Sequence, residues 1–216
     1  GGVIVVDDYA HHPTEIRATI QAARDRGAGR VWAIAQPHTY SRVAALADAF
    51  ATALATADRA VITPVYAARE QALPGVDASG IAARMRSAVV AADLDDAARI
   101  AADGAAAGDS LLFLGAGDVT LASRQCLGHL ARRQAAAVRD AARVQGLELA
   151  GDARTDAVLG AHTSLRTGGP AALLVRASSI DDLVAWLRLA TEHGLPARVL
   201  GRGSNVLVDD AGFPGL

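Results

Sequence analysis

The chain has 216 residues, of which 51% are hydrophobic and 20% are charged, and its formal net charge is −2. This composition is globular rather than disordered, and the small negative charge argues against a nucleic-acid-binding surface. The apolar runs are far shorter than the about 20 residues that cross a membrane. A single cysteine, Cys126, excludes an internal disulfide and a multi-cysteine metal site.

All 21 residues counted as lysine or arginine are arginine, because the sequence contains no lysine. This excludes a phosphate-binding loop of the G-x-x-x-x-G-K-[ST] type and Schiff-base chemistry, since both need a lysine. The chain begins with two glycines directly before an apolar run and stops just after another such run, at Leu216. We therefore expect it to be a piece of a longer protein.

The first part of the chain alternates short apolar runs with helical patterns. Buried strands are predicted at residues 3–6, 31–35, 60–63 and 111–114. Helices are predicted from Pro13 onwards and over residues 41–57, 79–86 and 94–107. Strands that are apolar throughout and separated by helices indicate a parallel sheet covered on both faces. The predicted fold class is therefore a doubly wound, mainly parallel α/β sheet.

The second part is smaller and changes character at an Ala- and Arg-rich segment, residues 128–150. This segment predicts a helix, either the last packing helix of the first domain or a linker to a second unit. Beyond it, a truncated α+β unit is predicted, with strands at 172–176, 197–200 and 206–208 and a helix over 179–193. The predicted boundaries are a first domain at 1–130, a helical linker at 131–152 and a second domain at 153–216.

The densest polar cluster follows the first predicted strand directly and contains Asp8, Tyr9, His11 and His12. Ligands of parallel α/β sheets bind at the carboxyl ends of the strands, so these four residues are candidate binding residues. A proline follows His12 and suits the first position of a helix, so a helix start with capping residues is an alternative. A metal site is a further alternative, although the side chains of adjacent turn residues diverge.

Two more clusters follow later strands. His38 and Arg42 lie in the segment QPHTYSR after residues 31–35, where Arg42 is suited to hold a carboxylate through two hydrogen bonds. The alternative is a plain loop in which Ser41 caps the next helix. The segment GAGD, residues 115–118, lets backbone amides approach a ligand, or lets a helix pack tightly on the strand.

The motifs VDDYAHHPTEI, QPHTYSR and GAGD, in this order and each at a strand end, resemble the C-terminal domain of the Mur ligases. The resemblance covers residues 1 to about 130 and points to the branch that joins L-alanine to UDP-N-acetylmuramate. It implies a doubly wound domain that closes over ATP held mainly by a central domain. It also implies that Asp8 lies near the nucleotide ribose and that Tyr9, His11, His38 and Arg42 line the amino acid pocket.

The reaction of that family uses ATP and Mg²⁺ to phosphorylate the muramyl carboxylate, and the amine of L-alanine then attacks the acyl phosphate. The resemblance implies that the phosphate-binding lysine and the metal ligands belong to the central domain, in agreement with the absence of lysine here. We therefore expect no catalytic residue and no metal ligand in this chain.

A second resemblance lies in the segments HTSLRTGGPA, which starts at His162, and LGRGSNVLVDDAGFPGL, which ends the chain. Together they resemble the start of the UDP-N-acetylenolpyruvoylglucosamine reductases, flavoenzymes that use NADPH and FAD to make UDP-N-acetylmuramate. A glycine-rich loop after a strand exposes N–H groups that suit the FAD pyrophosphate, and the alternative is a simple hairpin turn. The implied FAD-binding residues of this loop are Gly201, Arg202, Gly203, Ser204 and Asn205.

Two arginines near this site have open roles. Arg166 either faces the flavin or forms an ion pair, and Arg202 stands where the family often has glycine. The proton-donating serine and glutamate of that family lie further along its sequence than Leu216.

The sequence is therefore interpreted as the junction of a cytoplasmic, bifunctional enzyme of peptidoglycan-precursor synthesis. Its expected partners are UDP-sugar precursors, L-alanine and the remainder of the parent chain, with no nucleic acid and no membrane. We expect no turnover by either half alone and only weak FAD binding. The alternatives are a non-catalytic α/β nucleotide-binding or interaction module, and an artificial join.

Overall fold

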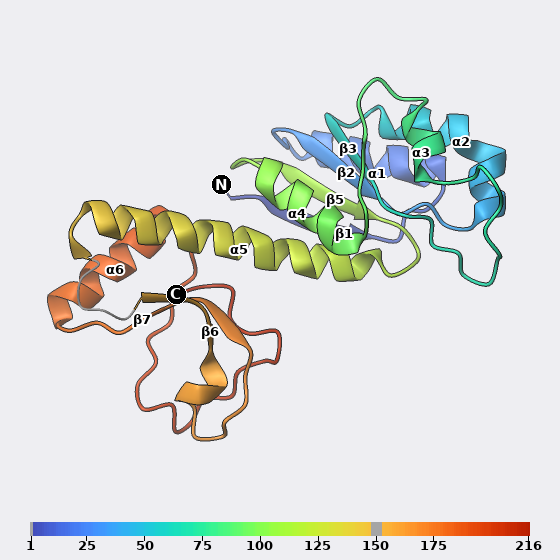
Figure 1. Ribbon diagram of the computed structural model, residues 1–216. Coiled ribbons are helices and arrows are strands. Elements are labelled where there is room, and N and C mark those ends of the chain that lie inside the picture. Colours follow the sequence, from blue (N-terminus) through green and yellow to red (C-terminus); the bar gives the residue numbers. More distant parts are fainter. Residues whose placement is uncertain (1, 148–152) are drawn as a thin grey trace. The chain divides into compact units, whose positions relative to one another are not determined.

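The computed structural model describes residues 2–147 and 153–216, and the chain forms two compact units (Figure 1). Unit 1 is Gly1–Leu127 and unit 2 is Gly128–Leu216. None of the helices in these described ranges is long and apolar enough to cross a membrane.

Unit 1 contains a five-stranded sheet in which every neighbouring pair is parallel. Its strands are β1 (Ile4–Asp8), β2 (Val31–Ala35), β3 (Arg59–Ile62), β4 (Val89–Val90) and β5 (Ser110–Leu114). The spatial order is β1-β5-β2-β3-β4, so β5 lies between the first two strands of the chain. This confirms the predicted parallel α/β fold of the first domain.

The central strands β2 and β5 are buried along their whole length, which explains why they are apolar throughout. The helices of unit 1 are α1 (Pro13–Asp25), α2 (Tyr40–Leu54), α3 (Ala78–Ala82) and α4 (Leu94–Gly104). Alternate strand residues such as Ala33 and Leu112 share one core with α1, α2 and α3. Trp32 points to the opposite face, where its ring abuts Gly104 at the end of α4. Helices therefore cover both faces, as a doubly wound sheet requires.

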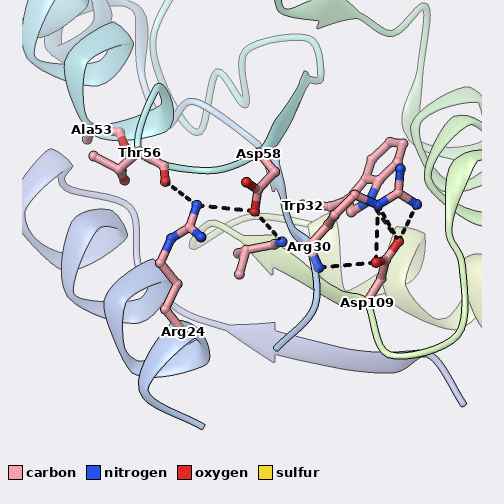
Figure 2. Close-up of polar contacts among 8 residues, drawn as sticks. Arg24, Arg30, Trp32, Ala53, Thr56, Asp58 and Asp109 are labelled. Atoms are coloured by element: carbon pink, nitrogen blue, oxygen red, sulfur yellow. Dashed lines mark hydrogen bonds and ion pairs between the residues drawn. The ribbon is translucent and has the colours of Figure 1, made fainter. Parts of the chain in front are cut away.

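The buried carboxylate of Asp109 lies at the amino ends of strands β2 and β5 (Figure 2). Asp109 accepts hydrogen bonds from the Arg30 guanidinium, at 2.6 Å from Nη2, from the indole N–H of Trp32 at 3.3 Å and from the backbone N–H of Ala106 at 2.9 Å. Burial by itself raises the pKa of Asp109, but the hydrogen bonds from the Arg30 side chain and from the backbone N–H groups of Ala106 and Arg30, together with the charge of Arg30, outweigh it and lower the pKa to about 2. The cluster fixes the starts of β2 and β5 at the edge opposite the predicted ligand site.

The described residues of unit 2 form an antiparallel pair of strands, a helix and the larger part of a helix that begins in unit 1. Its elements are β6 (Ala153–Val158), β7 (Pro170–Val175), the 3-10 turn η2 (Leu159–His162) and α6 (Ile180–Glu192), and α5 (Val119–Val144) spans the boundary with unit 1. The core of unit 2 is formed by Val138 and Ala142 of α5 together with Leu173, Trp186 and Leu189.

Part of the segment predicted to be a linker belongs to this core. Residues 131–144 are helical, and their buried alanines and Val138 pack against β7 and α6. An apolar stripe on a helix is the feature that allows such packing. Residues 148–152, the end of the predicted linker, lie outside the described residues.

The predicted strands at 197–200 and 206–208 are wrong, because the structure forms no strand there. Val199 and Leu207 are 67% and 78% exposed, so these apolar residues have no sheet face to pack on. The segments are held instead by separate hydrogen bonds, such as that from the N–H of Arg198 to the carbonyl of Leu216 at 2.8 Å. A short apolar segment becomes a strand only where a neighbouring strand supplies hydrogen-bond partners.

Candidate functional site

The loops that follow β1, β2, β3 and β5 emerge at the same edge of the sheet, because parallel strands all end there. Leu114 at the end of β5 pairs in register with Asp8 on one side and Ala35 on the other. Ala35 in turn pairs with Ile62, the last residue of β3. We call this edge, with its loop residues Tyr9, His11, His38, Arg42 and Tyr66, the carboxyl-end site.

Two of the candidate residues at or just after the end of β1, Asp8 and His12, have structural partners. The Asp8 carboxylate accepts hydrogen bonds from the backbone N–H of Ala10 at 2.8 Å and from the hydroxyl of Thr19 at 3.3 Å, so it holds the loop. His12 is the N-cap of α1, where its Nδ1 accepts from the N–H of Thr14. The structure thus gives His12 the capping role that was weighed as the alternative.

Tyr9 and His11 face the carboxyl-end site more directly. Tyr9 is 72% exposed, and its ring packs edge-on against His11 with 5.1 Å between the centroids. The Nδ1 of His11 lies 3.0 Å from the carbonyl oxygen of Tyr9. Glu15 accepts from the backbone N–H groups of His11 and His12, which lowers the pKa of its carboxyl.

The structure brings the two histidine loops together. The His38 ring lies 5.8 Å from that of His11 and stacks on Tyr66 at 5.5 Å, with 27° between the planes. Burial, followed by the positive charge of Arg42, lowers the pKa of His38, and Glu70 opposes this. An imidazole with a lowered pKa is neutral near pH 7.

Two buried nitrogen atoms at this site have no hydrogen-bond partner among the residues that the structure describes. They are Nδ1 of His38 and Nη1 of Arg42. Buried polar groups normally find a partner, and one that lacks it calls for a specific explanation. A guanidinium N–H beside a neutral imidazole suits an anionic oxygen ligand, and a carboxylate fits both. The predicted pocket residues His11, His38 and Arg42 therefore converge, whereas the Asp8 carboxylate is engaged by the loop residue Ala10 and by Thr19 of α1.

The glycines of the GAGD segment are explained by packing. A Cβ on Gly117 would lie 2.5 Å from Oε1 of Gln36 and 2.6 Å from Cγ of Tyr66. Gln36 is buried and donates to Asp118 at 2.6 Å, while it accepts from the N–H of Val119 at 3.2 Å. Of the two interpretations of this segment, tight packing is the one for which the structure gives contacts.

Sequence reasoning missed two residues of this site, Tyr66 and Glu70, which follow β3. Tyr66 stacks on His38, and Glu70 accepts hydrogen bonds from the backbone N–H and the hydroxyl of Ser41. The signal was available, because the rule that ligands gather at carboxyl ends of strands applies to the third strand as well.

In unit 2 the two predicted FAD-binding motifs lie against each other. The N–H of Ser164 donates to the carbonyl of Gly203 at 2.9 Å. Gly203 has φ +67°, and a Cβ there would collide with the carbonyl of His162, so this position needs glycine. Gly201 faces open space, and Gly201, Arg202, Ser204 and Asn205 are all exposed.

A cavity of about 820 Å³ lies beside these motifs, and its basic lining residues are His162, Arg166 and Arg202. None of the described residues that line it is acidic. Arg166 has φ +54°, and it forms no ion pair with another described residue. Basic side chains around a glycine loop fit an anionic group such as a diphosphate.

The carboxyl-end site lies within a region that matches a known family. The sequence model of the family described as "Mur ligase, glutamate ligase domain" matches residues 1–117, which is more than half of the chain. The match contains the five strands of unit 1 and both histidine loops. The chain belongs to the Mur ligase family.

Individual Mur ligases match about three fifths of the chain. The UDP-N-acetylmuramate–L-alanine ligase of Mycolicibacterium smegmatis is 46% identical over 133 residues, which are 60% of this chain and 28% of that protein. The ligase of that name from Frankia alni is 45% identical over 140 residues, 58% of this chain and 24% of that protein. A solved UDP-N-acetylmuramate–alanine ligase from Thermotoga maritima is 29% identical, with a TM-score of 0.45, and the match covers 58% of this chain and 26% of that one. The chain thus spans about a quarter to three tenths of the length of these relatives.

Among the described residues, no three His, Cys, Asp or Glu side chains lie where they could hold a metal together. Magnesium takes oxygen ligands from carboxylates and from substrate phosphates, and the carboxylates beside the carboxyl-end site are occupied by loop and helix N–H groups.

Proposed function

We propose that unit 1 is the amino-acid-binding domain of a ligase that joins L-alanine to UDP-N-acetylmuramate at the expense of ATP. The observation that carries this proposal is the pair of buried, unpartnered nitrogens on His38 and Arg42 beside His11. An α-amino acid bound through its carboxylate at these nitrogens leaves its amine free to attack an activated acyl group.

In this proposal the residues of unit 1 bind and orient the amino acid, and they do not carry out the chemistry. Arg42 holds one carboxylate oxygen, and neutral His38 supplies a further polar contact while excluding water with Tyr66. Fixing the amine close to its electrophile lowers the entropic cost of the reaction. ATP and Mg²⁺ belong to other domains of the complete enzyme.

A domain replacement tests this proposal. Residues 1–127 are placed in the Mycolicibacterium smegmatis ligase instead of its matching region, and phosphate release that depends on L-alanine is measured. Arg42→Gln is expected to raise KM for L-alanine about 10- to 100-fold, because a charge-assisted hydrogen bond is worth about 1.5–3 kcal/mol. Arg59→Gln, an exposed arginine at the opposite edge of the sheet, is the matched control and is expected to leave KM unchanged. Equal KM values for wild type and Arg42→Gln would refute the assignment.

For unit 2 we propose the first part of an FAD-binding domain of a UDP-N-acetylenolpyruvoylglucosamine reductase. The proposal rests on the two motifs, on their contact through Ser164 and Gly203, and on the basic cavity beside them. Bound FAD would supply hydride transfer from NADPH to the enolpyruvyl group. The residues present would only hold its diphosphate, through the loop 201–205, Arg166 and Arg202.

Titration of the intact chain with FAD, followed by flavin fluorescence anisotropy, tests this second proposal. Weak binding is expected, because residues 153–216 would form only the first part of a flavin domain. The pair Arg166→Gln and Arg202→Gln is expected to weaken binding several-fold, whereas Arg188→Gln on α6 is the control. Tight stoichiometric retention of FAD, or equal binding by the double variant, would contradict the proposal.

Together the two halves would belong to one cytoplasmic enzyme of peptidoglycan-precursor synthesis, in which the reductase product is the ligase substrate. Each half alone is expected to be inactive. A non-catalytic nucleotide-binding module would instead leave phosphate release in the domain replacement insensitive to every variant of the carboxyl-end site.

A further inference from the structure

The loop after β3 is attached to the start of α2 by its backbone. The N–H of Tyr66 donates to the carbonyl of Pro37 at 2.8 Å, and the carbonyl of Tyr66 accepts from the N–H of Thr39 at 2.9 Å. His38, between these two residues, is bridged to Tyr66 as in a parallel sheet and stacks on its ring. The loop thus forms one wall of the carboxyl-end site.

Helix α2 lacks a cap of its own. Its N-cap residue, Thr39, makes no side-chain capping hydrogen bond and has φ +64°, which is unusual for a residue other than glycine. The first N–H groups of a helix need acceptors from outside the helix. Glu70, 29 residues after Ser41 in the chain, supplies one such acceptor: its Oε2 accepts from the N–H of Ser41 at 2.9 Å, and its Oε1 accepts from the Ser41 hydroxyl.

This cap bears directly on the ligand-binding groups. His38 stands just before α2 and Arg42 lies in its first turn. No hydrogen bond from residues 2–147 or 153–216 holds the buried nitrogens Nδ1 of His38 and Nη1 of Arg42 in place. Their positions therefore depend on the backbone that carries them, and Glu70 holds that backbone at Ser41.

We propose that Glu70 is a positioning residue of the carboxyl-end site, which fixes the first turn of α2 so that His38 and Arg42 present their free nitrogens to the incoming carboxylate. The ligand in this statement rests on the proposed function, whereas the positioning itself does not. A carboxylate suits the task because it accepts two hydrogen bonds and its negative charge is favourable at a helix N-terminus.

The intact chain gives a ligand-free test, namely titration of the His38 imidazole by NMR. The charged or titratable groups that act on His38 are Arg42, His11 and Glu70, and burial is the largest cause of its lowered pKa. If Glu70 positions the first turn of α2, Glu70→Ala lets water reach His38 and raises its pKa toward 6.5. If Glu70 acts only as a nearby charge, the same substitution lowers the pKa further, because the carboxylate favours the protonated imidazole. The sign of the shift therefore separates the two roles.

Two further variants complete this test. Glu70→Gln keeps an acceptor for the Ser41 N–H and is expected to hold the pKa of His38 at or below the wild-type value. Gln71→Ala, at an exposed neighbour in the same loop, is the matched control and should leave the pKa unchanged. The proposal is overturned if Glu70→Ala lowers the pKa or leaves it unchanged, or if either of the other variants raises it equally. The dispersion of the amide spectrum reports folding, and Ser41→Ala, which removes only the hydroxyl donor, gives a milder variant with a smaller shift of the same sign.

The domain replacement described above supplies an independent readout. Glu70→Ala is expected to raise KM for L-alanine about tenfold while kcat changes much less, because the misplaced groups bind the substrate carboxylate. Glu70→Gln should restore most of the loss. A raised His38 pKa with an unchanged KM would support the positioning by Glu70 and refute the assigned amino acid site, so the two failures are distinguishable.

Discussion

The buried carboxylate at the amino edge of the sheet gives the sharpest stability prediction. Replacing Asp109 by Asn keeps the size of the side chain but removes its negative charge. In the folded protein the carboxylate accepts three contacts from the Arg30 side chain within 3.2 Å, one from the Trp32 indole and one from the Arg30 backbone N–H (Figure 2). It also accepts a hydrogen bond from the backbone N–H of Ala106. The amide retains one acceptor oxygen and leaves Arg30 without its buried partner.

The expected loss follows from the pKa of Asp109. The ordinary value is 3.8 and the folded value is about 2. One pKa unit corresponds to 1.36 kcal/mol, so the ionised side chain contributes about 2 kcal/mol to the free energy of unfolding. The Asp109 side chain is only 4% exposed, which supports using this value, although the Arg30 side chain is 40% exposed and water screens part of the attraction. Asp109→Asn is therefore expected to cost about 2 kcal/mol at pH 7.

The pH dependence has a definite sign. Because the folded-state pKa lies below the unfolded one, the contribution is complete above pH 3.8 and is lost as the pH falls toward 2. Urea unfolding followed by NMR separates the two units, since the indole N–H of Trp32 reports unit 1 and that of Trp186 reports unit 2. The wild type and Asp109→Asn should differ clearly at pH 7 and much less at pH 2.5, and only in the Trp32 signal.

Asp48→Asn is the matched control. Asp48 also pairs with an arginine, Arg84, at 2.7 Å, but its side chain is 90% exposed, and exposed ion pairs contribute little. Its unfolding midpoint should equal that of the wild type. If Asp109→Asn also unfolds at the wild-type urea concentration, or if its loss is the same at pH 7 and pH 2.5, the reasoning from burial and charge is wrong.

Three further predictions concern other parts of the chain. Gly117→Ala places a Cβ 2.5 and 2.6 Å from two neighbouring side chains and should destabilise unit 1 by about 1–3 kcal/mol in urea unfolding, whereas Gly128→Ala, in open space on a helix, should be neutral or stabilising. The His38 imidazole should titrate below 6.5 in NMR, and a value at or above 6.5 would contradict its burial beside a guanidinium. Leu173→Ala removes a fully buried side chain and should destabilise unit 2 by about 2–5 kcal/mol, as followed by the Trp186 signal. Leu207→Ala, at a side chain that is 78% exposed, should leave the stability of unit 2 unchanged. Similar losses of stability for both variants would refute the described core.

Local sequence signals predicted much of unit 1. The strands β2 and β5 are buried on both faces, so their residues are apolar throughout and could be read directly. The start of α1 could also be predicted, since a proline and an acidic residue mark its first turn. The two-residue strand β4 was not predicted, because a segment that is so short and exposed has no periodic pattern.

Unit 2 shows where such signals fail. The runs at 197–200 and 206–208 were predicted to be strands from their apolar residues. In the structure Val199 and Leu207 are exposed, and neither belongs to a strand. Strand β6 was not predicted, because its segment ARTDAV has exposed polar residues in its middle and is held by pairing with β7. Pairing partners, rather than the residues of a segment, decide between strand and loop in these cases.

The sequence by itself determined which loops carry polar chemistry, since that depends only on which residues follow each apolar run. Only the tertiary structure decided that β5 lies between β1 and β2, that His11 and His38 meet, and that Glu70 caps a helix 29 residues earlier in the chain. Strand order and long-range capping are set by contacts between distant segments, and no local window of sequence contains both partners of such a contact.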